Sequence, residues 1–191
     1  MPPWVRNALK RRFRSWRNSE DMKSTAAEDF DPKDYRRTLG QFATGVTVVT
    51  TRGQDGRFIG LTVNSFTSVS LQPPLVLWCL VRQSPSLAAF QEASHFAINI
   101  LAAGQHGLSR QFASQVPDRF AGVELEEGKA GVPRLKGVAA QLVCRNVGQF
   151  DGGDHVIFLG QVEEYLRSEE KPLLFHSGRY CSLTPHPDFP E

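Results

Sequence analysis

Residues 62–86 combine side chains that could bind a flat, phosphate-bearing ring system. The stretch opens with hydroxyl and amide groups and continues, after Pro73-Pro74, into the apolar run Leu75–Val81. That run is too short to span a membrane and has the length of a buried strand. Arg82 follows, beside Ser84, which could cap a helix that opens at the next residue, a proline. Uncharged donors suit the edge of a ring, an apolar wall suits its face, and a cation beside a helix N-terminus suits a phosphate. An ordinary edge strand, turn and buried strand would account for the same residues.

A second group of candidate residues lies in the C-terminal third. His155 begins an extended segment after a Gly-rich turn, where it could contact an amide of a ligand. Arg179, next to Gly178, could meet a phosphate while the backbone comes close. The sequence leaves a simpler interpretation open for each, namely a turn histidine bonded to Asp154 and a surface arginine. Arg119 has the same ambiguity.

Several standard catalytic motifs are missing from the sequence. It contains no GxGxxG after a strand, no GxxxxGK[ST], no GxSxG and no HExxH, which argues against a Rossmann dehydrogenase, a P-loop enzyme, an α/β-hydrolase and a zincin. Cys79, Cys144 and Cys181 are odd in number and lack metal-ligand spacing. They predict buried free thiols in a reducing compartment, and we expect a cytoplasmic protein with no metal site and no membrane span.

The charge is unevenly distributed. Residues up to Ser19 carry six basic side chains and no acidic one, so a formal net charge of +2 minus these six leaves −4 on the remainder. A mildly acidic folded part argues against a nucleic-acid-binding domain. We expect a flexible basic extension over residues 1–28, one domain over 29–185 and a tail over 186–191. Apolar residues recur at helical spacing in the extension, so a weak membrane-surface helix is an alternative to an untied tail.

The periodicity predicts a mainly β fold with a few short helices. Asp31-Pro32 is expected to open a helix that Gly45 is placed to end. Strands are predicted over residues 46–51, 58–63, 75–81, 95–101, 138–150 and 155–166, with a last extended piece over 173–183. Further helices are predicted over 87–93 and 105–115, and residues 117–133 are expected to form a loop. Six or seven short antiparallel strands suggest a small β-barrel, which removes open sheet edges.

These motifs, taken together, resemble the flavin reductase-like family, the FMN-binding split-barrel reductases that supply reduced flavin to two-component monooxygenases. The matching text runs from Asp34 to about Leu183 and includes, in order, GLTVNSFTSVSLQPPLVLWCL, FAINILAAGQ, GVPRLKG, GDHVIFLGQV and HSGRY. The resemblance implies a split-barrel homodimer with a flavin near the subunit interface. It also implies an NAD(P)H:flavin oxidoreductase that uses FMN or FAD and NADH or NADPH, with a flavin-dependent monooxygenase as a possible partner.

The resemblance further implies which residues form the site. Residues 62–65 would lie against the isoalloxazine and ribityl chain, and residues 79–86 would continue to the phosphate. The implied cofactor-binding residues are Thr62, Val63, Asn64, Ser65, Cys79, Leu80, Val81, Arg82, Gln83, Ser84, Ser86, Phe112, Ala113, Arg119, His176, Ser177, Gly178 and Arg179. The last four, with His155 as the catalytic residue that orients the carboxamide, would receive the nicotinamide nucleotide.

Hydride transfer to a flavin requires no protein nucleophile or metal, because the cofactor accepts the electrons and the protein supplies binding and orientation. This agrees with the lack of other catalytic motifs. A flavin-binding electron-relay protein that does not turn over nicotinamide is the alternative. The sequence does not decide between FMN and FAD or between NADH and NADPH.

Overall fold

The structure is a computed structural model that describes residues 29–186 and 188. The predicted basic extension, residues 1–28, therefore lies outside the described residues, as does most of the predicted tail. The chain divides into two units, Met1–Leu39 and Gly40–Glu191.

The described part of the first unit contains helix α2 (Pro32–Leu39). It begins where the sequence predicts, and Asp31 accepts the backbone N–H of Lys33 through Oδ1 at 3.0 Å, as an N-cap does. The prediction that the helix runs to Gly45 is wrong. The helix ends one residue before Gly40, a poor helix former, and Gly45 lies in the short strand β1 (Thr44–Gly45).

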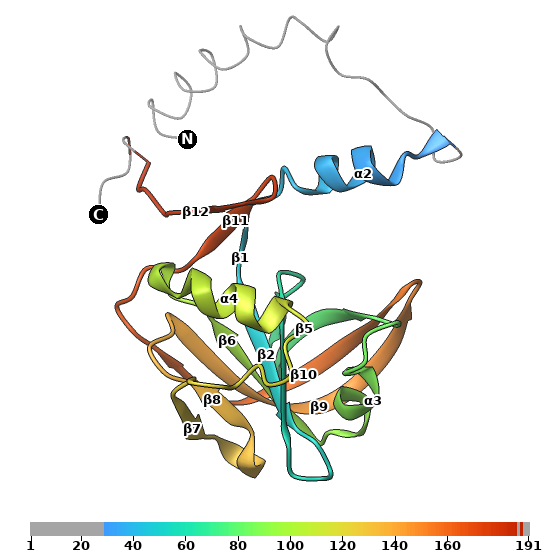
Figure 1. The fold of residues 1–191 in the computed structure, drawn as a ribbon, viewed down its shortest axis with the longest axis vertical. Helices are drawn as coiled ribbons and strands as arrows, with labels where there is room; N and C mark the ends of the chain where they lie inside the picture. The colour runs from blue at the N-terminus through green and yellow to red at the C-terminus, as the bar shows by residue number, and fades with distance from the viewer. Residues whose placement is uncertain (1–28, 187, 189–191) are drawn as a thin grey trace, which may run out of the picture. The chain divides into compact units, whose positions relative to one another are not determined.

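The second unit is built on a seven-stranded antiparallel sheet in the order β3-β2-β6-β9-β10-β5-β4 (Figure 1). Its strands are β2 (Thr47–Arg52), β3 (Phe58–Val63), β4 (Thr67–Leu71), β5 (Pro74–Val81), β6 (His95–Ile100), β9 (Ala140–Gly152) and β10 (His155–Arg167). The mainly β fold class is therefore confirmed, and β3 has the predicted bounds.

The two end strands of this sheet are consecutive in the sequence. Strand β3 ends at Val63 and β4 begins at Thr67, so the connection can span at most about 14 Å. In a flat sheet, six strand spacings would separate β3 from β4 by about 29 Å. The sheet must therefore curl until its two ends approach each other, which creates a seam between β3 and the β4–β5 hairpin.

The concave side of the curled sheet is filled by aromatic residues around Trp78. This side chain is fully buried and stacks on Phe158, with ring centroids 4.7 Å apart. Phe90 and Phe96 meet the indole edge-on at 5.0 and 5.8 Å. Each such side chain contributes about 1.5–3 kcal/mol on burial, so this cluster provides much of the stability of the curled sheet.

The buried side-chain amide of Asn99 joins the main sheet to the segment around Leu135. Asn99 Nδ2 donates to the carbonyl of Val48 at 2.9 Å, and Oδ1 accepts the N–H of Leu135 at 2.9 Å and Nε2 of Gln141 at 2.8 Å. Because the amide is fully buried and bonded on both sides, it fixes β2, β6, β9 and β8 (Pro133–Leu135) in register without an unpaired polar group.

Two small sheets and two short helices complete the unit. Sheet β1-β11-β12 contains β11 (Leu174–His176) and β12 (Arg179–Cys181), and β7 (Leu125–Glu127) pairs with β8. The predicted loop over 117–133 thus contains a strand, and the last extended piece is a hairpin. The helices are α3 (Leu87–Glu92) and α4 (His106–Ala113). The residue at the N-cap of α3 is Ser86. The prediction that Ser84 caps this helix is therefore wrong by two residues.

Among the glycines that the structure describes, Gly160 leaves the least room for an added Cβ. A Cβ there would lie 2.5 Å from Cζ of Phe96 and 2.9 Å from Cβ of Cys144. We expect Gly160→Ala to lower the free energy of unfolding by about 1–3 kcal/mol, measured by urea denaturation. In Gly107→Ala, where nothing lies within 4 Å of a new Cβ, stability should stay unchanged or rise slightly. Equal stability of the two variants would contradict this description of the core.

Candidate active site

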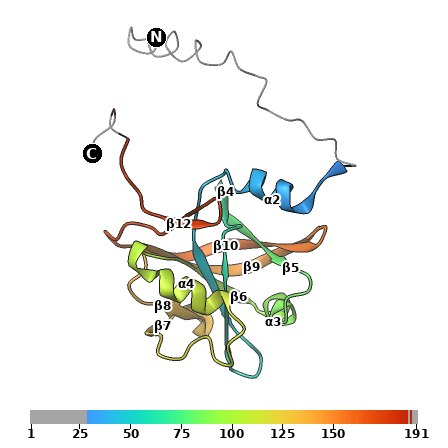
Figure 2. The same cartoon turned by 45° about the horizontal axis from the view of Figure 1, so that its top comes forward.

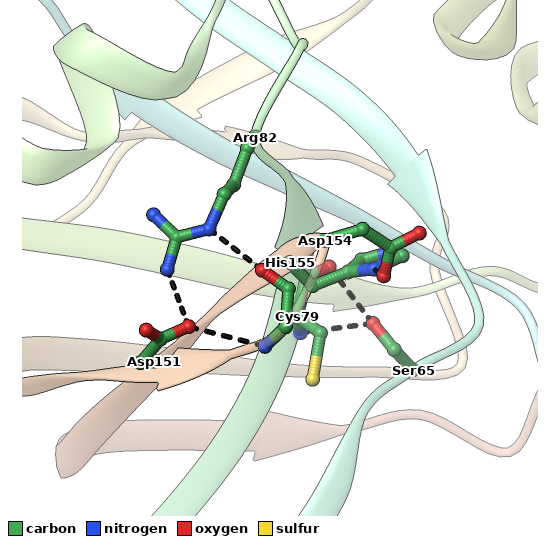
Figure 3. A network of polar contacts seen from close by, with 7 residues as sticks. Ser65, Cys79, Arg82, Asp151, Asp154 and His155 are labelled. Atoms are coloured by element: carbon green, nitrogen blue, oxygen red, sulfur yellow. Dashed lines mark hydrogen bonds and ion pairs between the residues drawn. The ribbon is translucent and has the colours of Figure 1, made fainter.

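Ser65 fastens the connection between β3 and β4 to the neighbouring strand β5. Its Oγ accepts the backbone N–H of Cys79 at 2.9 Å and donates to the carbonyl of Cys79 at 3.0 Å (Figure 3). Regular pairing of β4 with β5 begins only at Thr67 opposite Leu77. The Ser65 hydroxyl therefore takes the place of backbone pairing between the β3–β4 connection and β5. These bonds bring together two predicted site segments, residues 62–65 and 79–81.

His155 lies beside the C-terminal end of β5. It starts β10 directly opposite Val81, and its side chain is 42% exposed. Nδ1 lies 2.7 Å from Oδ1 of Asp154 (Figure 3), which confirms the interpretation of a turn histidine bonded to its neighbour. The same contact orients the ring and leaves Nε2 for a ligand, because Nε2 makes no hydrogen bond within the described residues.

Arg82 holds the turn that precedes His155. Its Nε donates to the carbonyl of Gly153 at 2.8 Å, and its Nη2 lies 2.6 Å from Oδ1 of Asp151. Its backbone N–H also donates to the carbonyl of Asp154 at 2.9 Å. The sequence assigned this guanidinium to a phosphate, whereas in the structure it bonds the β9–β10 turn (Figure 3).

A groove of about 990 Å³ opens beside the start of α3. That volume is at the upper end of the range for ligand-binding pockets. Three segments line it, residues 57–60, residues 85, 86 and 89, and residues 115–120. The lining combines two guanidinium groups, one carboxylate, the Ser86 hydroxyl and the rings of Phe58 and Phe120. This donor set, with apolar faces beside cations, fits a phosphate-bearing aromatic cofactor such as a flavin nucleotide.

Arg119 is also bonded within the chain. Its Nη1 donates to the carbonyl of Gly60 at 2.9 Å, and its Nε donates to the carbonyl of Ser114 at 2.9 Å. It therefore ties the loop after α4 to β3 at the edge of the groove. The simple interpretation of Arg119 as a free surface cation is wrong.

The predicted site residues range from buried to exposed, and many of them, including Thr62, Ser65 and Ser86, are half-buried. Leu80 is 2% exposed and Phe112 is fully buried, so both side chains belong to the core. Val81 and the polar residues Asn64 and Gln83 are exposed, as is Ala113. Asn64 makes no side-chain hydrogen bond in the described part of the chain, so its amide is available.

The predicted nucleotide segment, residues 176–179, forms the tip of the β11–β12 hairpin. Ser177 and Gly178 have φ values of 48° and 79°, which make a tight turn. Arg179 is exposed and forms no ion pair with the described residues. In Figures 1 and 2 this hairpin lies apart from the turn between β9 and β10.

Sequence reasoning did not assign Asp151 to the site. Its Oδ1 accepts the N–H of Gly153 at 3.1 Å as well as the Arg82 bond. An Asp two residues before the bonded amide is an Asx-turn pattern, and the order Asp-Gly-Gly is its signal in the sequence. Its partner could not be found in this way, because Arg82 is distant in the sequence.

Two physical effects change the acidity of groups at the site and in the core beside it. The hydrogen bond from Arg82, with the N–H of Gly153, holds the pKa of Asp151 below its usual range. Burial raises the pKa of the Cys79 thiol, and burial together with the charge of Glu163 raises the pKa of Cys144 to about 12. Both thiols are therefore protonated near neutral pH. All three cysteines are free, as predicted, but only Cys144 is buried, so the prediction of buried thiols is wrong for Cys79 and Cys181.

The lowered pKa of Asp151 gives a test of the Arg82 bond. The ionised carboxylate is favoured by folding, so its stabilising contribution is present above about pH 3.9 and is lost as the pH falls through the lowered value. A titration followed by carboxyl ¹³C NMR should show the pKa of Asp151 returning toward about 3.9 in Arg82→Gln. Asp55, whose pKa is lowered by Arg57, is the internal control and should not move. If the pKa of Asp151 is the same in Arg82→Gln as in the natural chain, the Arg82 side chain is not what lowers it.

Comparison with known proteins identifies the family. Residues 39–184 match the flavin reductase like domain, and the chain belongs to this family. The reductase subunit HsaB of a flavin-dependent monooxygenase from Rhodococcus jostii is 41% identical over 168 residues, which cover 87% of this chain and 86% of that protein. The FMN reductase (NADH) SmoA of Agrobacterium fabrum is 43% identical over 148 residues, covering 78% and 84%.

A solved structure agrees with these relatives. The NADH:FAD oxidoreductase SgcE6 of Streptomyces globisporus, in complex with NAD and FAD fragments, superposes with a TM-score of 0.77 at 41% identity and covers 83% of this chain and 98% of that chain. The predicted fold class and the predicted class of enzyme, a flavin reductase of the oxidoreductases, are confirmed. The electron-relay alternative is not favoured.

Two features are absent from the described residues, a metal site and a membrane-spanning helix. No group of three or more His, Cys, Asp or Glu side chains in residues 29–186 and 188 is arranged to hold a metal ion. In the same residues, no helix has the length and apolar character needed to cross a membrane.

Proposed function

We propose that the seam between β3 and β5 binds the flavin, and that the chain uses it to oxidise NADH or NADPH. One observation supports this most strongly. The Ser65–Cys79 bonds and the pairing of Val81 with His155 unite three segments that are distant in sequence and that all belong to the predicted site. A flavin, when bound, supplies the acceptor for the hydride of a reduced nicotinamide.

On the flavin side, this proposal gives each residue a role in binding. The Asn64 amide and the backbone of residues 62–65 would meet the polar edge of the ring and the ribityl chain. Ser84, Ser86 and the adjoining groove would receive the phosphate, because hydroxyls, backbone N–H groups and the nearby Arg119 favour an anion there. The groove has room for the adenylate half of FAD, so we propose that both FMN and FAD are accepted.

On the nicotinamide side, His155 would donate from or accept at Nε2 to orient the carboxamide. Asp154 holds the ring at Nδ1, and Arg82 holds the turn that carries both residues. Arg179, which has no ion pair with the described residues, would meet a phosphate of the nucleotide.

The activity is tested by following NADH and NADPH oxidation by the purified protein with and without added FMN or FAD. We expect a rate that depends on added flavin with at least one of the two donors. Tight flavin binding without oxidation of either donor would contradict the proposal and favour the electron-relay alternative.

His155→Ala tests the site within that assay. Losing one hydrogen bond of about 0.5–1.5 kcal/mol should raise KM for the donor about two- to tenfold and leave the flavin Kd unchanged. His186→Ala, at a histidine whose side chain is 61% exposed in the C-terminal segment, is the matched control and should behave like the natural chain. A weaker flavin Kd in His155→Ala with an unchanged donor KM would place His155 on the flavin side.

We also propose a homodimer, supported by the outer face of β5 and β10. Their buried residues face the core, and the alternate residues Leu77, Ile157 and Leu159 form an apolar face on the other side. Phe150 of β9, 55% exposed, extends it. A sheet that is apolar on both sides favours association with a second apolar surface.

Sedimentation equilibrium tests this assembly. We expect a mass twice the 21.3 kDa of the chain, and a monomer for Leu159→Glu, because Leu159 lies directly opposite Leu77 within the apolar face. Leu183→Glu, at a residue 45% exposed outside the strands, is the control and should remain dimeric. A dimeric, folded Leu159→Glu would exclude this face.

Partner and location are part of the same proposal. The reductase subunits among the relatives support a flavin-dependent monooxygenase as the acceptor of reduced flavin. Three free thiols suit a reducing compartment, and on that basis we propose a cytoplasmic location, with residues 29–185 as the functional domain.

A further inference from the structure

A hydrogen bond outside the predicted site fastens the β11–β12 hairpin to α4. The Tyr180 hydroxyl donates to Oγ of Ser109 at 2.9 Å, and Ser109 is only 1% exposed. The Tyr180 ring also packs against Phe175 of the same hairpin, with centroids 5.6 Å apart, and lies 6.4 Å from the ring of His106. These contacts fix one face of the hairpin against the helix.

The same helix residue is bonded to the strand proposed to bind the flavin. Oγ1 of Thr62, near the end of β3, donates to the carbonyl of Ser109 at 2.7 Å. Ser109 thus accepts one bond through its side chain from β12 and one through its backbone from β3. A single buried residue therefore sets the spacing between the hairpin and the flavin strand.

Strand register decides which hairpin residues remain available. Phe175 pairs with Tyr180, and His176 pairs with Arg179. Directly opposed residues share a face of a hairpin, and successive pairs alternate between faces. Because the Phe175–Tyr180 pair faces the helix, the His176–Arg179 pair lies on the opposite face, where a ligand can reach it.

We propose that Tyr180 and Ser109 are positioning residues for the nicotinamide nucleotide. They act by holding the His176–Arg179 pair at a fixed place relative to Thr62. This inference rests on the proposed function, since it assumes that the hairpin binds the donor and that β3 binds the flavin. Neither residue contacts the reacting atoms in this account, so their loss should affect donor binding more than flavin binding.

The test uses Tyr180→Phe, Ser109→Ala and the double variant of the full-length chain. Each single change should raise KM for the nicotinamide donor about two- to tenfold, as expected for one lost hydrogen bond, with the flavin Kd changed less than about twofold. The double variant should match the single variants, because both changes remove the same bond and their effects are then not additive. Tyr165→Phe is the matched control, since Tyr165 is 83% exposed on β10, and it should leave KM unchanged.

Thermal unfolding distinguishes positioning from a purely structural role. A lowered Tm with the donor KM unchanged in both single variants would overturn the inference, as would effects that add in the double variant. If one variant fails to fold, the other single variant decides by the same criterion. Failure of the proposed function is distinct, because the natural chain would then show no flavin-dependent oxidation at all.

Discussion

The short connection between β3 and β4 is the constraint on which the arrangement of the site depends. Residues 64–66 must join the two end strands of a seven-stranded sheet, so the sheet cannot lie flat. The curl brings the end of β3 against β5, and Ser65 bonds both backbone groups of Cys79 where no strand continues. The proposed flavin edge is therefore a product of the curl of the sheet, and it would not exist in a flat sheet.

Different interactions stabilise the fold and shape the site. The aromatic cluster at Trp78 buries large apolar side chains, and each of them contributes about 1.5–3 kcal/mol to the free energy of folding. The polar contacts at the edge, such as Arg82 with Asp151, are exposed and contribute little to stability. Their effect is geometric, since they hold the turn that orients His155. Changes at this edge should therefore alter ligand binding more than folding.

The sequence predicted the strands of the main sheet except β4, because their hydrophobic patterns are regular, and it gave an edge strand at β4 only as an alternative. Strand β3 has the predicted bounds, and the Asp55-Gly56 turn before it contains Gly56 at a φ of 80°. The β7–β8 hairpin was missed because its strands have three residues each and lie among glycines and prolines. The last hairpin was read as one extended piece, although Ser177-Gly178 is a turn dipeptide.

The site was predicted less completely, because partners across a sheet leave no local pattern. The hydroxyl and amide residues at the end of β3 predicted a polar edge, and the structure shows one, with Asn64 exposed and Ser65 bonded to Cys79. That this edge binds a flavin stays a prediction. Nothing near Arg82 in the sequence indicates that the β9–β10 turn occupies its guanidinium. The link from Tyr180 through Ser109 to Thr62 was equally invisible, since these residues come from β12, α4 and β3.

A crystal structure of the protein with bound FMN would show where the flavin lies. We expect the ring to lie along residues 62–65 and beside Cys79, with its phosphate toward Ser84 and Ser86. A ring bound elsewhere, with this edge of the curled sheet empty, would contradict flavin binding at the seam between β3 and β5.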